Sequence, residues 1–218
     1  MDNVTETICT TPDQRPPFDA AWEGRRRLAE ALRRLNETAL TTDIPAEDLC
    51  VLADRIAAET AKLAALPRIA GRKGHGLRHA ERGEEMKDFI YEASPATGYS
   101  NAVSVPTHIW SENGTVHAVA TPGWGQEGPS GCVHGGVIAL LLDQLCGVAQ
   151  RTSGIPGHTG TLTIRYRHLT PIGTPLLLKA KIARTEGRKS IVEAGIWVGD
   201  RCTVECEGIM IARKKSPT

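Results

Sequence analysis

A glycine-rich turn that leads into an apolar stretch constrains this sequence more than any other feature. Residues 131–136 read Gly-Cys-Val-His-Gly-Gly, and the apolar run 137–142 follows before Asp143. Glycines ahead of an apolar run predict the start of a buried helix, whose free N–H groups bind developing negative charge. A carboxylate among leucines is unfavourable unless it is paired or used in chemistry. The pattern therefore predicts a site that stabilises an oxyanion and supplies a base or nucleophile.

The segments around this turn predict an α+β domain. A long helix over 133–150 is apolar nearly all round, so we expect a sheet to sheath it. One expected strand precedes the helix and three or four follow it, with turns at glycines such as Gly173, Gly187 and Gly199. The expected strands are 115–120, 159–168, 175–184, 190–198 and 201–211.

The first 93 residues predict an appendage to this domain. Residues 1–17 are polar and contain prolines, so we expect them to be poorly ordered. Residues 18–93 predict a helical hairpin followed by a basic, glycine-containing linker, and 94–218 form the main domain. The hairpin is indicated by apolar residues at helical spacing on either side of Pro45: Leu28, Leu32, Leu35, then Leu49, Leu52, Ile56 and Leu63. We expect it to pack on the main domain or on a partner subunit.

Composition argues against several classes of protein. A net charge of +1 gives no overall attraction to nucleic acid. The longest apolar run, 137–142, is far shorter than the ~20 residues that a membrane span needs. The first 17 residues lack the basic and apolar regions of a secretory signal. The six cysteines form neither a C-x-x-C pair nor a zinc-ligand pattern, so we expect reduced thiols in the cytoplasm and no metal.

Two stretches of the main domain resemble a known family. The first is 127–136 with Asp143, nine residues after the histidine, and the second is 159–166 with Thr170-Pro171 after it. Together they resemble the hotdog-fold acyl-CoA thioesterases, most closely the phenylacetate-degradation type and its animal relatives. The resemblance covers roughly residues 94–213. It implies the hotdog fold, an antiparallel sheet wrapped round one long central helix.

The resemblance also implies roles for individual residues. Asp143 resembles the catalytic acid, which activates water or attacks the thioester carbonyl. Gly135 resembles the residue whose N–H holds the thioester oxygen, and Thr159 resembles a Ser or Thr that positions the water. His134 resembles a residue that braces the turn. Gly128 departs from the pattern, since some relatives carry Asn or Gln there as a polar contact.

Coenzyme A carries phosphates, so its site needs local positive charge. The turn that contains Arg188 and Lys189 resembles the family's phosphate-side loop, and Arg184 is close in sequence. Arg72 and Lys73 in the basic linker are weaker candidates. Coenzyme A enters as part of the substrate, and no other cofactor is implied.

The spacing of the two central site residues predicts an oligomer. Gly135 and Asp143 are eight positions apart, hence ~12 Å along one helix. An oxyanion donor and a base should meet within ~3 Å of one reacting centre. One helix cannot supply both to the same site, so we expect a homodimer or a dimer of dimers whose sites are shared between protomers.

The sequence thus predicts an acyl-CoA thioesterase that releases a free carboxylic acid and CoA. Two alternatives stay open at this stage. One is an enoyl-thioester hydratase of the same fold, although the catalytic histidine motif of those enzymes is absent. The other is a non-catalytic acyl-CoA-binding or regulatory protein, with the hairpin serving a partner.

Overall fold

The computed structural model describes residues 20–69, 91–152, 154 and 157–212. Residues 1–17, expected to be poorly ordered, and most of the basic linker, including Arg72 and Lys73, lie outside the described residues. The elements in chain order are α1 (Ala20–Thr41), α2 (Ala46–Ala64), β1 (Thr107–Glu112), β2 (Thr115–Ala120), the 3-10 helix η2 (Trp124–Gln126), α5 (Gly135–Thr152), β3 (Gly157–Tyr166), β4 (Leu176–Glu186), β5 (Lys189–Val198) and β6 (Arg201–Ala212).

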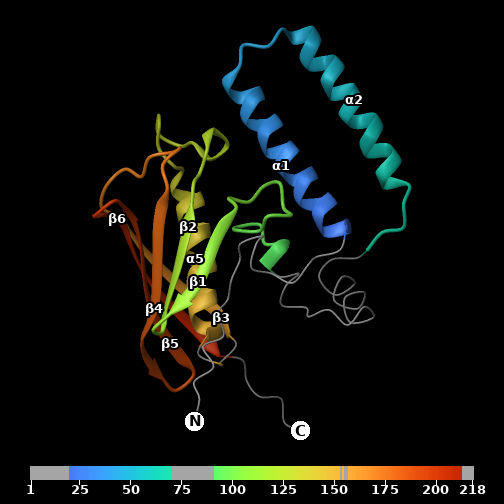
Figure 1. Cartoon of the computed structure of the whole chain (residues 1–218). Helices are drawn as coiled ribbons and strands as arrows, with labels where there is room; N and C mark the ends of the chain where they lie inside the picture. Colours follow the sequence, from blue (N-terminus) through green and yellow to red (C-terminus); the bar gives the residue numbers. More distant parts are fainter. Residues whose placement is uncertain (1–19, 70–90, 153, 155–156, 213–218) are drawn as a thin grey trace.

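The described strands form one antiparallel sheet in the order β1-β2-β4-β5-β6-β3 (Figure 1). Three pairs of neighbours are joined by two-residue turns, as the glycines predict. In the β1–β2 turn, Asn113 and Gly114 have φ of 49° and 75°, the left-handed conformation that tight hairpins require. The sequence did not predict β1. This strand pairs with β2 and forms one edge of the sheet. β3 forms the opposite edge and has β6 as its only neighbour among these strands.

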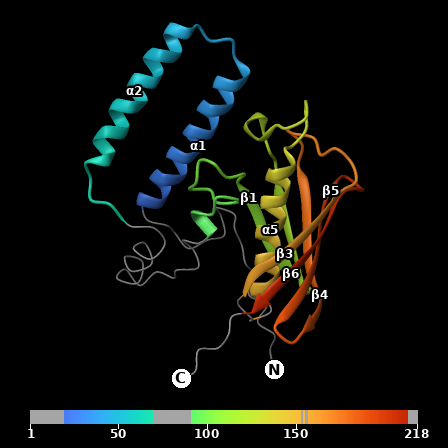
Figure 2. The ribbon, with the colours of Figure 1, turned by 180° about the vertical axis from the view of Figure 1, so that it is seen from behind.

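Helix α5 lies across one face of the sheet and forms the centre of the core (Figures 1 and 2). Its side chains Leu141, Leu142 and Leu145 are buried. They share one hydrophobic cluster with inward-facing residues of β2 and β4 to β6, such as Val116 and Leu178. The burial of alternate strand residues against one apolar helix confirms the predicted α+β fold of the hotdog type.

One stripe of α5 stays uncovered in the single chain. Leu140 is 41% exposed. Gly136 is exposed, and Asp143 and Gly147 are half-buried on the same side. The expectation that the sheet sheaths the helix all round is therefore wrong, because the sheet reaches only one side. Asp143 lies at the border of the buried face, within reach of solvent.

The predicted N-terminal hairpin is confirmed, and its two helices differ in their surroundings (Figure 1). Helix α1 packs beside η2 and buries Ala29. Helix α2 lies on the far side of α1 from the sheet and contains no buried residue. Its apolar side chains remain open, with Ile56 40% and Leu63 59% exposed. The main domain thus contacts the hairpin through α1.

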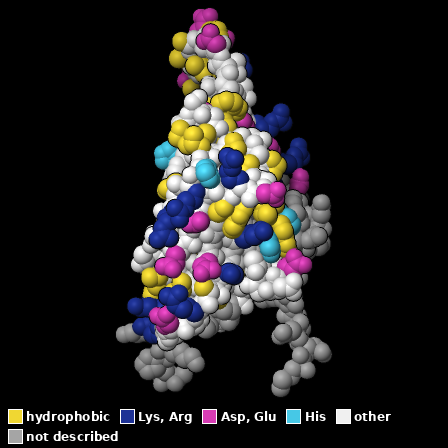
Figure 3. All heavy atoms as spheres, turned by 90° about the vertical axis from the view of Figure 1, so that its left-hand side faces the viewer, with side chains coloured by type: hydrophobic (Ala, Val, Ile, Leu, Met, Phe, Trp, Pro, Cys, Tyr) yellow, Lys and Arg dark blue, Asp and Glu magenta, His cyan; other side chains and the backbone are white. Residues whose placement is uncertain are grey.

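The surface shows no segregation of charge on the face seen in Figure 3. Lysine, arginine, aspartate and glutamate side chains are interspersed there with hydrophobic ones. Such mixing produces no large field of one sign on that face. In the described part of the chain, no helix combines the length and apolar character needed to cross a membrane.

Candidate active site

The start of α5 is capped by His134. The His134 carbonyl accepts the first helical hydrogen bonds, from the N–H groups of Val137 and Ile138. Its imidazole Nδ1 accepts a further bond from the Gly136 N–H at 3.0 Å. Of the four N–H groups that a helix start leaves open, those of Val137 and Gly136 are thus bonded to the carbonyl and the side chain of His134, and that of His134 itself donates to the Gln126 carbonyl. This geometry makes His134 a helix cap that braces the turn.

The remaining N–H at the helix start belongs to Gly135. No described residue accepts a hydrogen bond from it. Gly135 is only half-buried. On its other side, the Tyr166 hydroxyl donates to the Gly135 carbonyl at 2.9 Å. The glycine is thereby held in place while its N–H, at the positive end of the helix dipole, is free to bind a negative oxygen.

The loop before His134 is tied down by its own hydrogen bonds. The Glu127 carboxylate accepts from the Gly131 N–H at 2.6 Å, and the Gly128 N–H donates to the Cys132 carbonyl at 2.9 Å. Gly131 has φ of +71°, which favours glycine. A Cβ at residue 128 would lie 2.7 Å from the Cα of His134. The close packing of Gly128 on His134 leaves no room for the Asn or Gln that some relatives carry.

Asp143 is bonded to Thr159 within the same chain. The Thr159 hydroxyl donates to Asp143 Oδ1 at 2.7 Å, from edge strand β3 to the middle of α5. Thr159 pairs with buried Met210 and so shares its inward side of the sheet. The strand register shifts between Thr159 and Thr161, an irregularity that re-aims side chains. The structure therefore brings together the two residues to which the resemblance assigns water activation.

A pair of buried thiols lies on the interior side of this carboxylate. Cys146 on α5 and Cys206 on β6 are both buried. The hydrogen bond with Cys206, burial and the charge of Asp143 all raise the pKa of the Cys146 thiol. The hydrogen bond with Cys146 lowers the pKa of the Cys206 thiol, and the charge of Asp143 acts to raise it. The interior side of α5 near Asp143 therefore contains buried thiols, while Asp143 itself is only half-buried.

Gly135 and Asp143 lie on one helix, as the sequence predicted. Eight positions of regular α-helix separate them by ~12 Å. Each chain therefore has two separate parts of a site on α5, one at Gly135 and one at Asp143, which we call half-sites. One half-site has the unpartnered N–H, and the other has the bonded carboxylate and hydroxyl.

The three residues expected to bind phosphate differ in the hydrogen bonds that their side chains already make. Arg184 Nε donates to Glu186 Oε1 at 2.6 Å, and this hydrogen bond raises the pKa of Arg184. Arg188 Nη2 donates to the Ala212 carbonyl at 2.7 Å, which ties the β4–β5 turn to the end of β6. Lys189 has no hydrogen bond or ion pair to any described side chain. Of the three, Arg184 is the least available for a ligand.

The turn that carries Arg188 and Lys189 lies at the same end of the sheet as Thr159. Met210 on β6 pairs with Thr159 on one side and with Ser190, next to Lys189, on the other. Neighbouring strands are ~4.8 Å apart, so the turn and Thr159 are separated by about 10 Å across β6. The cationic turn and the carboxylate half-site therefore flank the same part of the sheet. Within the described residues, no group of histidine, cysteine and acidic side chains is arranged to hold a metal ion.

Sequence reasoning gave no role to Tyr166 or Glu127, and both support the turn. Tyr166 ends a strand that faces the helix start, a position that follows only from the sheet register. Glu127 lies four residues before Gly131. An acidic residue just ahead of a Pro-Ser-Gly turn was an available signal for side-chain bonding to the turn's N–H groups.

Comparisons with known proteins identify what the chain is similar to. The family model described as thioesterase superfamily matches residues 130–205. The crystal structure of a thioesterase superfamily protein superposes with a TM-score of 0.75 at 30% sequence identity. That likeness covers 96% of this chain and 98% of the other. The part of this chain outside the likeness is much shorter than α1 or α2, so the likeness includes the hairpin.

Two curated relatives match over a shorter stretch. Acyl-coenzyme A thioesterase THEM4 of Xenopus laevis is 31% identical over 98 residues, which are 44% of this chain and 43% of that protein. The protein of the same name from Mus musculus is 30% identical over 91 residues, 42% of this chain and 39% of its own length. The chain therefore spans less than half the length of either relative.

Proposed function

Because the chain belongs to the thioesterase superfamily, we propose that it is an acyl-CoA thioesterase that releases a carboxylic acid and CoA. The observation that carries the proposal is the hydrogen bond from Thr159 to Asp143. This bond joins a hydroxyl on the edge strand β3 to a carboxylate on α5. The first N–H of that same helix is unpartnered. The names of the two THEM4 relatives support the same substrate class.

We derive the proposed chemistry from the donors and acceptors of this pair. The Thr159 proton points to Asp143 Oδ1, so the Thr159 oxygen keeps lone pairs that can accept a hydrogen bond from water. The second carboxylate oxygen of Asp143 takes the other proton of that water, whose oxygen bonds to the thioester carbon. As the C–S bond breaks, the proton passes from Asp143 to the leaving sulfur. A Gly135 N–H stabilises the intermediate oxyanion.

The donor and the base come from different protomers in this proposal. Two surfaces of the single chain are open for such an assembly. One is the free edge of β3, whose unpaired backbone groups form a template for another strand. The other is the uncovered stripe of α5 that contains Leu140, 41% exposed, between Gly136 and Asp143. Pairing two chains through these surfaces brings the α5 helices together, so that Gly135 of one chain faces Asp143 of its partner.

We propose that Arg188 and Lys189 bind the phosphates of CoA, and we expect the double variant Arg188→Ala with Lys189→Ala to raise KM for acyl-CoA. A rise of about threefold to tenfold is expected for two exposed charges. Both side chains contact a remote part of the substrate equally in ground and transition states, so kcat should stay unchanged. Steady-state kinetics at low and high salt measure this, and the KM difference should shrink at high salt.

The control for this variant is Arg201→Ala, which removes an exposed arginine from the start of β6, at the other end of the sheet. It should leave KM unchanged. The melting temperature checks the loss of the Arg188 bond to Ala212. A fall in kcat at unchanged KM in the double variant would contradict the proposed phosphate contact.

The proposed activity is tested by thiol release from a panel of acyl-CoAs of varied chain length, with aromatic members and an enoyl-CoA. Thiol release that depends on Asp143 supports the thioesterase. Tight binding of acyl-CoA without thiol release would instead identify a binding protein. Consumption of the enoyl-CoA without thiol release would identify a hydratase. The described cysteines are free thiols, which suits the reducing cytoplasm where we propose that the enzyme works.

A further inference from the structure

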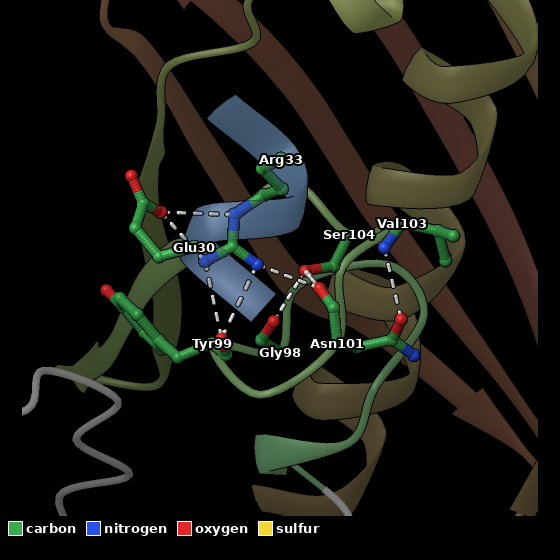
Figure 4. A network of polar contacts seen from close by, with 7 residues as sticks. All are labelled: Glu30, Arg33, Gly98, Tyr99, Asn101, Val103 and Ser104. Atoms are coloured by element: carbon green, nitrogen blue, oxygen red, sulfur yellow. Dashed lines mark hydrogen bonds and ion pairs between the residues drawn. The ribbon is translucent and has the colours of Figure 1, made fainter. Parts of the chain in front are cut away.

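Helix α1 is fixed to the main domain at two anchor points. Arg26 donates two hydrogen bonds to the fully buried Glu92 carboxylate, at 2.8 and 3.0 Å. Two turns further along, Arg33 donates to the backbone carbonyls of Asn101 and Tyr99 and also pairs with Glu30 (Figure 4). Bidentate and charge-assisted bonds of this kind have defined geometry. They set the position of α1 against the 91–106 segment.

A third contact joins α1 to the 3-10 helix η2. Glu37 Oε1 accepts a hydrogen bond from the Trp124 N–H at 3.2 Å. A Cβ on Gly123 would lie 2.8 Å from that same oxygen, and one on Gly125 would lie 2.9 Å from the Asn36 amide nitrogen. Two glycines therefore permit this close approach. Since Gly123 has φ of −104°, an ordinary value for any residue, it is the approach of Glu37 that favours glycine here.

The third contact is separate from the anchor at Arg33. A half-open cleft of about 320 Å³ is lined from α1 by Arg33, Arg34 and Glu37 and from the main domain by Tyr99 and His108. Because of this cleft, α1 does not pack against the main domain along its whole length. The bond from Trp124 to Glu37 is a hydrogen bond between α1 and η2, beside the close approach of the Asn36 amide to Gly125.

From η2 the connection continues to the start of α5. The Gln126 side chain accepts from the Gly123 N–H at 2.9 Å, which closes η2 on itself. The Gln126 carbonyl accepts from the His134 N–H at 2.8 Å. His134 is the cap of α5, and the next residue carries the unpartnered N–H. A short series of hydrogen bonds thus leads from Glu37 on α1 to Gly135.

We infer that Glu37 is a positioning residue for the oxyanion turn, and that the N-terminal hairpin acts through it to hold that turn in the reactive geometry. This inference rests on the proposed function. An oxyanion donor must be held to within a fraction of an ångström, because its contribution depends on being in place before charge develops. The turn is half-exposed, and the contact from α1 adds to the hydrogen bonds that the turn makes within its own loop and with Tyr166.

Glu37→Ala should lower kcat about fivefold at unchanged KM, the factor that one hydrogen bond of ordinary strength is worth. Glu37→Gln keeps an acceptor oxygen and should restore kcat to within about twofold of the parent. The matched control is Glu30→Ala, which removes another glutamate from α1, whose only hydrogen-bond partner within the described part of the chain is Arg33. Its kcat should be unchanged, since Arg33 keeps its two backbone carbonyls. Equal losses in Glu37→Ala and Glu30→Ala would overturn the inference.

Gly123→Ala tests the same contact from the opposite side. The added Cβ should push the Glu37 carboxylate away from the Trp124 N–H and lower kcat by a similar factor. In Glu37→Ala with Gly123→Ala, the space is free and the second substitution should add almost nothing. Two changes that act through one contact are non-additive, whereas independent effects would multiply to about 25-fold. Multiplication would show that the two residues do not act through their contact.

Amide hydrogen exchange separates this inference from the proposed function, because it needs no substrate. In full-length Glu37→Ala and Gly123→Ala, peptides covering 124–138 should exchange faster than in the parent, while peptides from β3 should not change. Glu37→Gln should match the parent. If no acyl-CoA is hydrolysed, the proposed function fails, and the exchange data still show whether Glu37 holds the turn. Unchanged exchange over 124–138 in both variants would refute the inference that Glu37 holds the turn, even in an active enzyme.

Discussion

Replacing Asp143 by asparagine should lower kcat for acyl-CoA hydrolysis by ~10²-fold or more, the loss expected for an essential base. The amide keeps the size of the side chain and an oxygen that can accept the Thr159 hydroxyl, but it cannot take a proton from water. KM should change little, because the residues proposed to bind the CoA arm are unchanged. Thiol release measured under saturating substrate gives kcat directly.

The fold of this variant should be unaffected. Asp143 is half-buried and hydrogen-bonded, so its replacement relieves no unpaired buried charge. The melting temperature should therefore stay within a few degrees of the parent value, as for other substitutions that keep shape and hydrogen bonding. Asp54→Asn on exposed α2 is the matched control and should retain full activity. Hydrolysis by Asp143→Asn within a few-fold of the parent would remove Asp143 from the mechanism.

Local patterns were sufficient to predict most of the fold. The H-G-G turn marked the start of α5 to within two residues, since helix caps and glycines act over a few positions. Turn glycines with positive φ, such as Gly187 and Gly199, marked the strand ends for the same reason. β1 was missed because its six residues place Ile109 and Trp110 side by side and so alternate poorly. Its place at the sheet edge depends on pairing with β2.

Contacts between distant segments could not be predicted in this way. Glu37 and Trp124 are 87 positions apart, and no spacing rule connects a helix residue to a loop at that distance. The pairing of Arg184 with Glu186 was predictable, because residues two apart on a strand point to the same side. The position of Asp143 at the border of the buried face was not, because the uncovered stripe of α5 is itself apolar. A sequence pattern cannot distinguish a face that contacts the sheet from one that awaits a partner subunit.

Mixing two inactive variants should restore activity if each site is built from two chains. One variant is Asp143→Asn and the other is Gly135→Pro, which deletes the N–H at the helix start. In a mixed dimer with shared sites, one site contains both defects and the other contains neither. Random exchange of equal amounts makes half the dimers mixed, so about a quarter of parental activity should return. The measurement is thiol release before and after subunit exchange.

The structure makes Gly135→Pro a well-suited partner for this test. Residue 135 follows the cap at His134 and is thus the first helical position, where proline is favoured. A Cβ there would lie 3.4 Å from the Tyr166 hydroxyl, which is a van der Waals contact. The melting temperature of Gly135→Pro and mass-tagged detection of mixed dimers are the controls. If the base and the donor act within one chain, every site in every dimer stays defective. Exchange without any recovery of activity would therefore assign both groups to a single chain, against the ~12 Å that the helix places between them.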